Sequence, residues 1–100
     1  MLIVAGFVRL PAGQVPALLD AARAQADATR AEDGCLQYTY AEDVFEPGVI
    51  RVFELWRDQA ALDAHFGAPH MKPWRAALAA AGVEERLLHA WDLAGEGRAV

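Results

Sequence analysis

The chain has 100 residues, of which 55% are apolar and 23% are charged, and it carries a formal net charge of −5. This length fits one domain over residues 1–100, with a core at about residues 2–94 and a short loose C-terminal tail. The nine Lys and Arg residues are scattered and no apolar run approaches the ~20 residues of a membrane span, so we expect neither a nucleic-acid nor a membrane partner. The chain contains no Ser and no Asn, which excludes a serine triad.

The chain starts with an apolar strand that is followed by an amphipathic helix. Residues 2–10 (LIVAGFVRL) are nearly all apolar and are followed by Pro11, which predicts a strand buried on both faces. Residues 14–31 carry apolar side chains at helical spacing, and we expect Gly34 to stop this helix. No basic segment precedes the apolar start and the single Cys35 cannot form an internal disulfide, so we expect a cytoplasmic protein.

Two further strands come next in the sequence. Residues 35–42 (CLQYTYAE) alternate so that Leu36, Tyr38 and Tyr40 are expected on one face. Residues 49–57 (VIRVFELWR) form the following strand. One of its faces is expected to carry Ile50, Val52 and Trp56, and the other Phe53 and Leu55.

The last third of the chain predicts two helical segments and a final strand. Asp58 is a favourable N-cap for a short helix through Phe66. A second helix follows, and Pro73 indicates that its regular part begins there, after an irregular lip at residues 67–72. Residues 83–94 form a fourth strand, with Leu87, His89, Trp91 and Leu93 on one face.

The element order β-α-β-β-α-β predicts an α+β, ferredoxin-like fold with a four-stranded antiparallel sheet. Two helices can cover only one face of such a sheet, yet the strands are apolar on both faces. In the first strand, Leu2, Val4 and Val8 oppose Ile3, Ala5 and Phe7. A bare apolar sheet face is larger than a soluble monomer normally tolerates, so we expect a homodimer whose sheets face each other.

Two histidines lie five residues apart in the stretch 63–74, DAHFGAPHMKPW. Helical zinc ligands usually lie four residues apart, so that both imidazoles share one face. Across Gly67 and Pro69, the side chains of His65 and His70 are expected to point in different directions. No Cys or carboxylate lies close in sequence to complete a site, and we therefore expect no metal.

His65 fits a general base better than it fits a metal ligand. It lies three residues after Leu62 at the edge of the buried stripe, where an apolar cavity could meet it. An imidazole there titrates near neutral pH and can take a proton from a phenolic hydroxyl. The alternative is a structural histidine, for which Glu54 on the preceding strand is the obvious partner. His70 is expected to close the turn at a helix start or, less favourably, to contact substrate.

Aromatic side chains could form the walls of this cavity. Trp74 lies on the inward stripe of the second helix, where it either packs in the core or forms a wall for a flat ligand. Together with Phe66 it would clamp an aromatic ring. The other candidate lining residues are Tyr40, Phe53 and Trp91.

The sequence offers no motif for a redox cofactor, because no G-x-G-x-x-G follows a strand. We therefore expect no cofactor. An electron-rich phenol or hydroquinone, once deprotonated, can pass an electron to dioxygen itself. The protein then needs only to exclude water, hold the ring and accept the proton.

Two sequence elements resemble the antibiotic biosynthesis monooxygenase family, and within it most resemble the small bacterial quinol monooxygenases. The element E-x-G-C-x-x-Y is matched by Glu32, Gly34, Cys35 and Tyr38, and the element E-x-W-x-D-x-x-A-L-x-x-H-x-x-x-P-H by Glu54, Trp56, Asp58, Ala61, Leu62, His65, Pro69 and His70. The resemblance covers about residues 1–93 and implies a dimeric α+β barrel. It favours a cofactor-independent monooxygenase that oxidises a small quinol or polyphenol with O2.

Three other functions stay open. Haem degradation is disfavoured by two differences. Haem-degrading relatives use an Asn on the first strand, where this chain has Gly6, Phe7 and Val8, and they use a His near the position that is Trp74 in this chain. An isomerase of a small phosphorylated signal is disfavoured by the scarcity of Lys and Arg near the second element. The alternative from a different class is a non-catalytic dimer that binds a small aromatic compound or stabilises a pathway partner.

Overall fold

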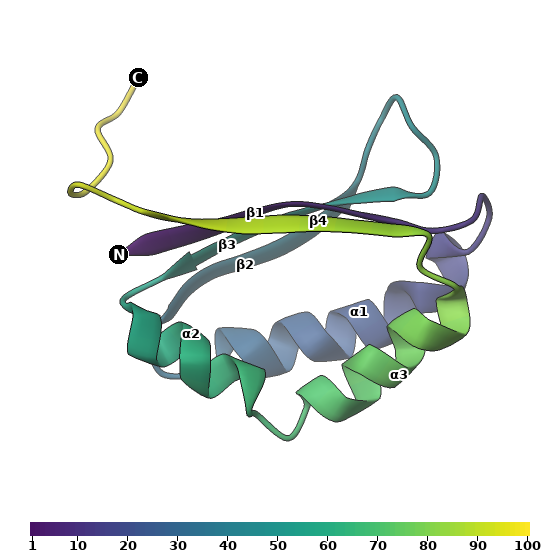
Figure 1. The fold of residues 1–100 in the computed structure, drawn as a ribbon, viewed down its shortest axis with the longest axis horizontal. Helices are drawn as coiled ribbons and strands as arrows, with labels where there is room; N and C mark the ends of the chain where they lie inside the picture. The colour runs from purple at the N-terminus through teal and green to yellow at the C-terminus, as the bar shows by residue number, and fades with distance from the viewer.

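The computed structural model describes residues 1–100 as one four-stranded sheet with three helices on one of its faces (Figure 1). Every expected element is present, with ends within two residues of the predicted ones. The elements are β1 (Leu2–Arg9), α1 (Val15–Arg30), β2 (Cys35–Glu42), β3 (Val49–Trp56), α2 (Gln59–Phe66), α3 (Met71–Ala81) and β4 (Glu85–Asp92). No helix combines the length and the apolar character needed to cross a membrane.

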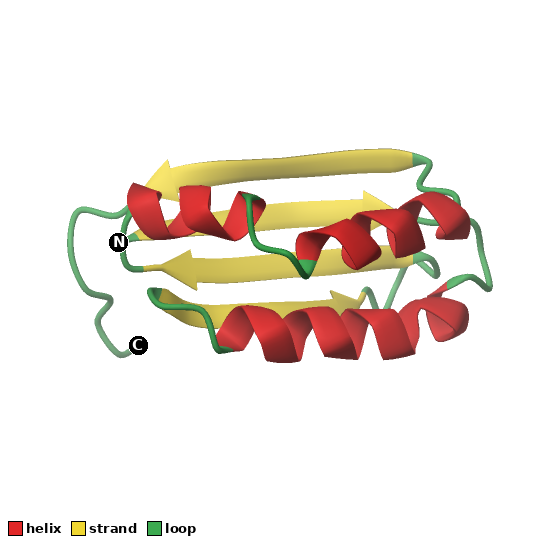
Figure 2. Ribbon diagram, turned by 90° about the horizontal axis from the view of Figure 1, so that it is seen from below, coloured by secondary structure: helices red, strands yellow, loops and turns green.

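The sheet has the strand order β2-β3-β1-β4, and all three strand pairs are antiparallel. This topology confirms the ferredoxin-like α+β fold. Figure 2 shows that α1 lies over the β2 side of the sheet, while α2 and α3 follow one another over the β1 and β4 side. The other face of the sheet carries no helix, as expected because the helices of this fold can cover only one face.

The core lies between the covered face of the sheet and the helices, in two clusters. One cluster, around α1 and α3, consists of Val8, Leu10, Val15, Leu18, Ile50, Val52, Met71 and Trp74. The other, around α2, consists of Leu2, Val4, Ala26, Tyr38, Trp56, Ala61 and Leu62. The alternation along β3 explains the layer, because Ile50, Val52 and Trp56 are buried while Phe53 between them is exposed.

The helix termini confirm the expected N-cap of α2 and correct two other predicted helix boundaries. Asp58 caps α2, since its Oδ1 accepts a hydrogen bond of 2.8 Å from the Ala61 N–H. By contrast, α1 ends at Arg30, and Gly34 adopts a positive φ of 86° in the turn before β2. The expectation that regular helix begins at Pro73 is also wrong, because α3 begins at Met71. A proline in the first helical turn removes only an N–H that has no partner within the helix.

The expectation that Leu36 lies on the same face of β2 as Tyr38 and Tyr40 is wrong as well. The register of β2 against β3 is irregular between Cys35 and Gln37, so the alternation of faces is broken at this point. Leu36 is consequently half exposed, whereas Tyr38 is buried. The strand keeps its regular alternation only from Gln37 onward.

Candidate active site

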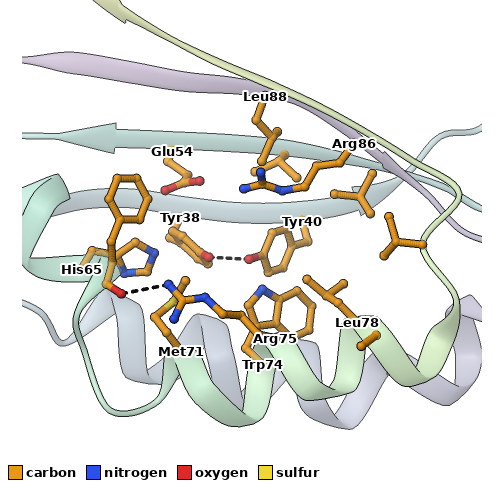
Figure 3. A pocket seen from close by; sticks show the side chains of 15 residues that line it. Tyr38, Tyr40, Glu54, His65, Met71, Trp74, Arg75, Leu78, Arg86 and Leu88 are labelled. Atoms are coloured by element: carbon orange, nitrogen blue, oxygen red, sulfur yellow. Dashed lines mark hydrogen bonds between the residues drawn. The ribbon is translucent and has the colours of Figure 1, made fainter.

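A cavity of about 480 Å³ lies between the covered face of the sheet and α3 (Figure 3). Its wall is mostly apolar, with Val8, Val52 and Leu88 on the sheet side and Trp74 and Leu78 on the α3 side. Figure 3 shows polar side chains gathered at one end of this space, where α2 and β3 meet it. A cavity of this size holds a small aromatic molecule and keeps most of its surface away from water.

His65 lies at that polar end of the cavity and is 2% exposed. Its Nδ1 is 2.7 Å from Oε2 of Glu32, a residue 33 positions earlier in the loop after α1. A carboxylate can only accept, so Nδ1 carries the proton and donates it, which leaves Nε2 as the unprotonated nitrogen. The ring is fixed further by Trp56 and Tyr38, at centroid distances of 4.8 and 5.5 Å. The imidazole is thus held in one orientation and one tautomer.

The surroundings of His65 favour its neutral form. Burial lowers the pKa of His65 below its ordinary value of 6.5, while the hydrogen bond to Glu32 opposes this shift by raising it. The side chain is therefore ready to accept a proton at neutral pH. This is the protonation state that a general base requires.

The structure brings His70 close to His65, contrary to the sequence-based expectation that the two side chains point apart. The His70 Nε2 lies 3.4 Å from Oε1 of Glu32, and its Nδ1 lies 2.9 Å from Oε1 of Gln25 in α1. The turn at residues 67–70 folds back, so that both imidazoles meet the same carboxylate from different directions.

Glu32, His65 and His70 form the group of side chains that could hold a metal ion, with one ligand atom of each within 4.8 Å of the others. The carboxylate of this group is distant in sequence, and the fold alone brings it to the two histidines. The Glu32–His65 and Gln25–His70 hydrogen bonds already account for the arrangement of the two rings, and the absence of a resident metal stays a prediction.

Two tyrosines of β2 continue the polar end of the cavity along the sheet. Their hydroxyls are hydrogen-bonded to each other, and Tyr38 also accepts a hydrogen bond of 3.2 Å from Nε2 of Gln25. Tyr40 stacks on Trp74 with a centroid distance of 5.3 Å. Burial raises the pKa of both phenols, so both stay protonated and act as hydrogen-bond donors.

Glu54 is the acidic side chain that lines the cavity from β3. Its Oε1 accepts a hydrogen bond of 3.0 Å from the Trp56 indole, and not from His65 as the sequence led us to expect. Glu32 is the partner of His65 instead. Burial raises the pKa of the Glu54 carboxyl, whereas the Trp56 hydrogen bond and the charge of Arg86 lower it.

The residues predicted for substrate binding are divided between the two faces of the sheet. His65, Phe66, Trp74 and Tyr40 all line the cavity. His70 does not line it, but contacts Glu32 behind it. Phe53 and Trp91 lie on the uncovered face, because they pair across the sheet with Ala5 and Ile3 and share the outward alternation of those residues.

Four further side chains of this region were not predicted from the sequence. Glu32 and Gln25 orient the two histidines, and Arg75 and Arg86 line the cavity. The two arginines weaken the reason for disfavouring an anionic ligand, since Arg86 comes from β4 and was not near the motif in sequence. The position of Arg86 in the cavity follows from the register of β4 against β1, which the sequence does not specify.

The first strand also bears on the haem-degrading alternative. Gly6 has a positive φ of 149°, and a Cβ at this position would lie 1.9 Å from the carbonyl oxygen of Leu87. An Asn side chain therefore does not fit at position 6 in this sheet. This geometry disfavours a haem-type site that uses an Asn there.

A small ferredoxin-like protein with a largely apolar cavity and an oriented histidine is the class that this fold and site define. The chain matches the family model described as "Antibiotic biosynthesis monooxygenase" over residues 1–77. It is 40% identical over 76 residues to the Mycobacterium tuberculosis protein named "Putative monooxygenase Rv0793", a match covering 74% of this chain and 71% of that protein. The chain belongs to the antibiotic biosynthesis monooxygenase family.

Solved structures agree with this assignment. A structure from Deinococcus radiodurans, described as "a putative antibiotic biosynthesis monooxygenase", is 31% identical with a TM-score of 0.88, covering all of this chain and 98% of that one. The structure of Rv0793 is 28% identical with a TM-score of 0.83, covering 97% and 98%.

A third relative, "Uncharacterized protein sll1783" from Synechocystis, is 32% identical over 69 residues. This match spans 69% of this chain but just under half of that protein, 47%. The family and the names of the relatives indicate an oxidoreductase of the monooxygenase type and leave its substrate open.

Proposed function

We propose that the protein oxidises a small quinol or polyphenol with O2 and without a cofactor, with His65 as the general base. The observation that carries this proposal is the neutral imidazole at the end of a largely apolar cavity, oriented by Glu32 through Nδ1. A histidine that is held by a carboxylate on one nitrogen presents a defined lone pair on the other. Its lowered pKa keeps this lone pair available at neutral pH.

The reaction begins with transfer of a phenolic proton to Nε2 of His65. The phenolate passes one electron to O2, and the resulting superoxide and phenoxyl radical combine at a ring carbon to form a C–O bond. The peroxide anion formed in this way takes back the proton held on Nε2 of His65. The resulting hydroperoxide then loses water as its O–O bond breaks and the hydrogen on the same carbon leaves as a proton. A hydroquinone and one O2 thus give one hydroxylated quinone and one water, so atoms and electrons balance.

The remaining cavity walls match what this chemistry requires of the protein. Trp74 and Tyr40 are stacked and offer a flat surface, and Phe66 lies beside His65 at a centroid distance of 5.9 Å. These groups hold an aromatic ring and exclude water, which increases the effective strength of the base. Because the Tyr38 and Tyr40 hydroxyls bond to each other, one of the two O–H groups stays free to donate a hydrogen bond to the oxygen from which the proton is removed.

We further propose that the working form is a cytoplasmic homodimer in which the uncovered sheet faces pack together. Phe53, Leu87 and Trp91 are 37, 48 and 54% exposed on that face. Phe53 lies on β3, and Leu87 and Trp91 lie on β4, the two strands that flank β1. A second copy of the chain would cover this apolar surface. The proposed cytoplasmic location rests on Cys35, the single cysteine of the chain, which is present as a free thiol.

The test is oxygen uptake by the purified protein across a panel of hydroquinones, catechols and polyketide aromatics. We expect at least one compound to be consumed well above its uncatalysed rate, and His65→Gln to lower this rate by about 100-fold or more. Lys72→Gln, which replaces an exposed side chain of α3 outside both the cavity and the uncovered sheet face, serves as the control. Unchanged turnover in His65→Gln would show that His65 is structural.

A second outcome would favour a binding protein instead of an enzyme. The cavity is suited to a small aromatic ligand whether or not a reaction follows, because its wall is mostly apolar. Ligands that raise the melting temperature without any oxygen uptake would indicate a non-catalytic dimer. The same panel therefore separates the two functions.

A further inference from the structure

Arg86 lines the cavity and forms no ion pair or hydrogen bond with another group of the protein. Its residue in β4 pairs with Val8 of β1, which in turn pairs with Ile50 of β3, and both neighbours are buried under the helices. The side chain of Arg86 therefore emerges on the covered face. Figure 3 shows its guanidinium directed into the cavity toward Glu54 and above Tyr40.

Arg86 differs from several other arginines because its guanidinium has no partner within the protein. Arg9, Arg51 and Arg57 form ion pairs with acids outside the cavity. Arg75 lines the cavity but donates to the backbone oxygen of Phe66 at 2.9 Å. Arg86 takes part in no hydrogen bond or ion pair of the protein, so all its donors are free for a ligand.

The acidic group of the cavity leaves the donors of Arg86 unengaged. Glu54 forms no ion pair with Arg86, and one of its oxygens is engaged by the Trp56 indole. Burial raises the pKa of the Glu54 carboxyl, while the charge of Arg86 lowers it. The cavity thus presents cationic guanidinium groups in a protein whose overall charge is −5.

We propose that the ligand of this cavity is an aromatic acid, whose carboxylate binds the guanidinium of Arg86 while its phenolic hydroxyl meets His65. The proposal rests on the proposed function for the role of His65, and it adds the chemical class of the substrate. A planar guanidinium matches the two oxygens of a carboxylate with two parallel hydrogen bonds. Of the two arginines that line the cavity, Arg86 alone has all its donors free, and two of them suffice for the two oxygens of one carboxylate.

The first experiment measures oxidation of 2,5-dihydroxyphenylacetate against its primary amide, which has the same ring and shape but no charge. We expect kcat/KM to be at least about 10-fold higher for the acid. Arg86→Gln should abolish this preference by lowering kcat/KM for the acid alone. Arg23→Gln, an exposed arginine on α1 outside the cavity, removes the same charge and should leave the preference intact.

The second experiment measures binding without oxidation, so that the two proposals can fail separately. Quenching of tryptophan fluorescence reports binding of 4-hydroxyphenylacetate and of 4-hydroxyphenylacetamide. Tighter binding of the acid that disappears in Arg86→Gln supports the aromatic-acid site, even if no quinol is oxidised. Equal binding of acid and amide, or a preference that survives in Arg86→Gln, overturns it. A melting temperature of Arg86→Gln within about 2 °C of the parent value excludes misfolding as the cause.

Discussion

The two faces of the sheet are built from the same strands but have opposite polarity requirements. On the covered face, the row Tyr38, Glu54, Val4 and Ala90 runs across the four strands. On the uncovered face, the neighbouring row is Thr39, Phe53, Ala5 and His89. The ionisable side chains of Tyr38 and Glu54 thus lie buried under the helices, while Phe53, Leu87 and Trp91 are exposed on the other face.

The difference shows what each face needs in order to be stable. On the covered side, Glu54 and His65 find partners within the chain, since Glu54 accepts from Trp56 and His65 donates to Glu32, while Thr29 Oγ1 and His70 Nε2 are buried without a hydrogen bond. The uncovered face has no such compensation, because exposed apolar area becomes stable only when another surface removes it from water. The proposed dimer would remove this exposed apolar area from water, which the chain does not do by itself.

The largest expected effect comes from breaking the uncovered face. Phe53→Glu places a charge at the centre of the proposed dimer interface, where an unpaired buried charge costs roughly 2–5 kcal/mol. We expect the dimer dissociation constant to rise by at least about 100-fold in sedimentation velocity. The cavity lies on the other side of β3, so its ligand binding should persist in the monomer.

Leu19→Glu provides the control for this substitution. Leu19 is 56% exposed on α1, on the helix side of the sheet and outside the cavity lining. A charge introduced there should leave the oligomeric state unaltered. If the parent protein is monomeric at micromolar concentration, the proposed interface does not exist.

The fold was predictable from the sequence because its signals are local. Apolar periodicity and the Asp58 cap set the elements to within two residues, and the alternation along β3 already separated Phe53 from Val52. That same alternation should have kept Phe53 out of the cavity. For Trp91 the face depends on the register of β4 against β1, which the sequence does not specify.

The candidate site was predictable only where its residues lie on the helices or on β2. His65, Phe66 and Trp74 were found from the helical stripe. Glu32 was missed as the partner of His65 because the two are 33 residues apart, and Arg86 was missed because β4 joins the sheet from the other end of the chain. Contacts of this kind follow from topology and not from spacing.

An intermediate effect is expected from Glu32→Gln, which tests the internal compensation of the covered face. Glu32 raises the pKa of His65, so its removal should move the acid limb of kcat/KM to lower pH than in the parent protein, whose own limb lies below pH 6.5. At pH 7.5 the rate should still fall by about 10-fold, because the imidazole loses its orientation. Asp33→Asn, an exposed neighbour paired with Arg57, is the control. A limb that moves to higher pH would contradict the assigned contact.

The smallest expected effect concerns the stability of the covered face. The pKa of Glu54 is higher in the folded chain than in the unfolded chain, so the folded state binds more protons between these two values. The associated stability is present at low pH and is lost as the pH rises through the folded pKa. Glu54→Gln removes the carboxylate that must be buried at high pH and can still accept from the Trp56 indole through its amide oxygen. We therefore expect its melting temperature to exceed that of the parent by roughly 2–4 °C at pH 8 and by less at pH 4. A larger gain at pH 4 than at pH 8 would mean that the carboxylate is stabilised in the folded state, and that Arg86 is its partner and is not free for a ligand.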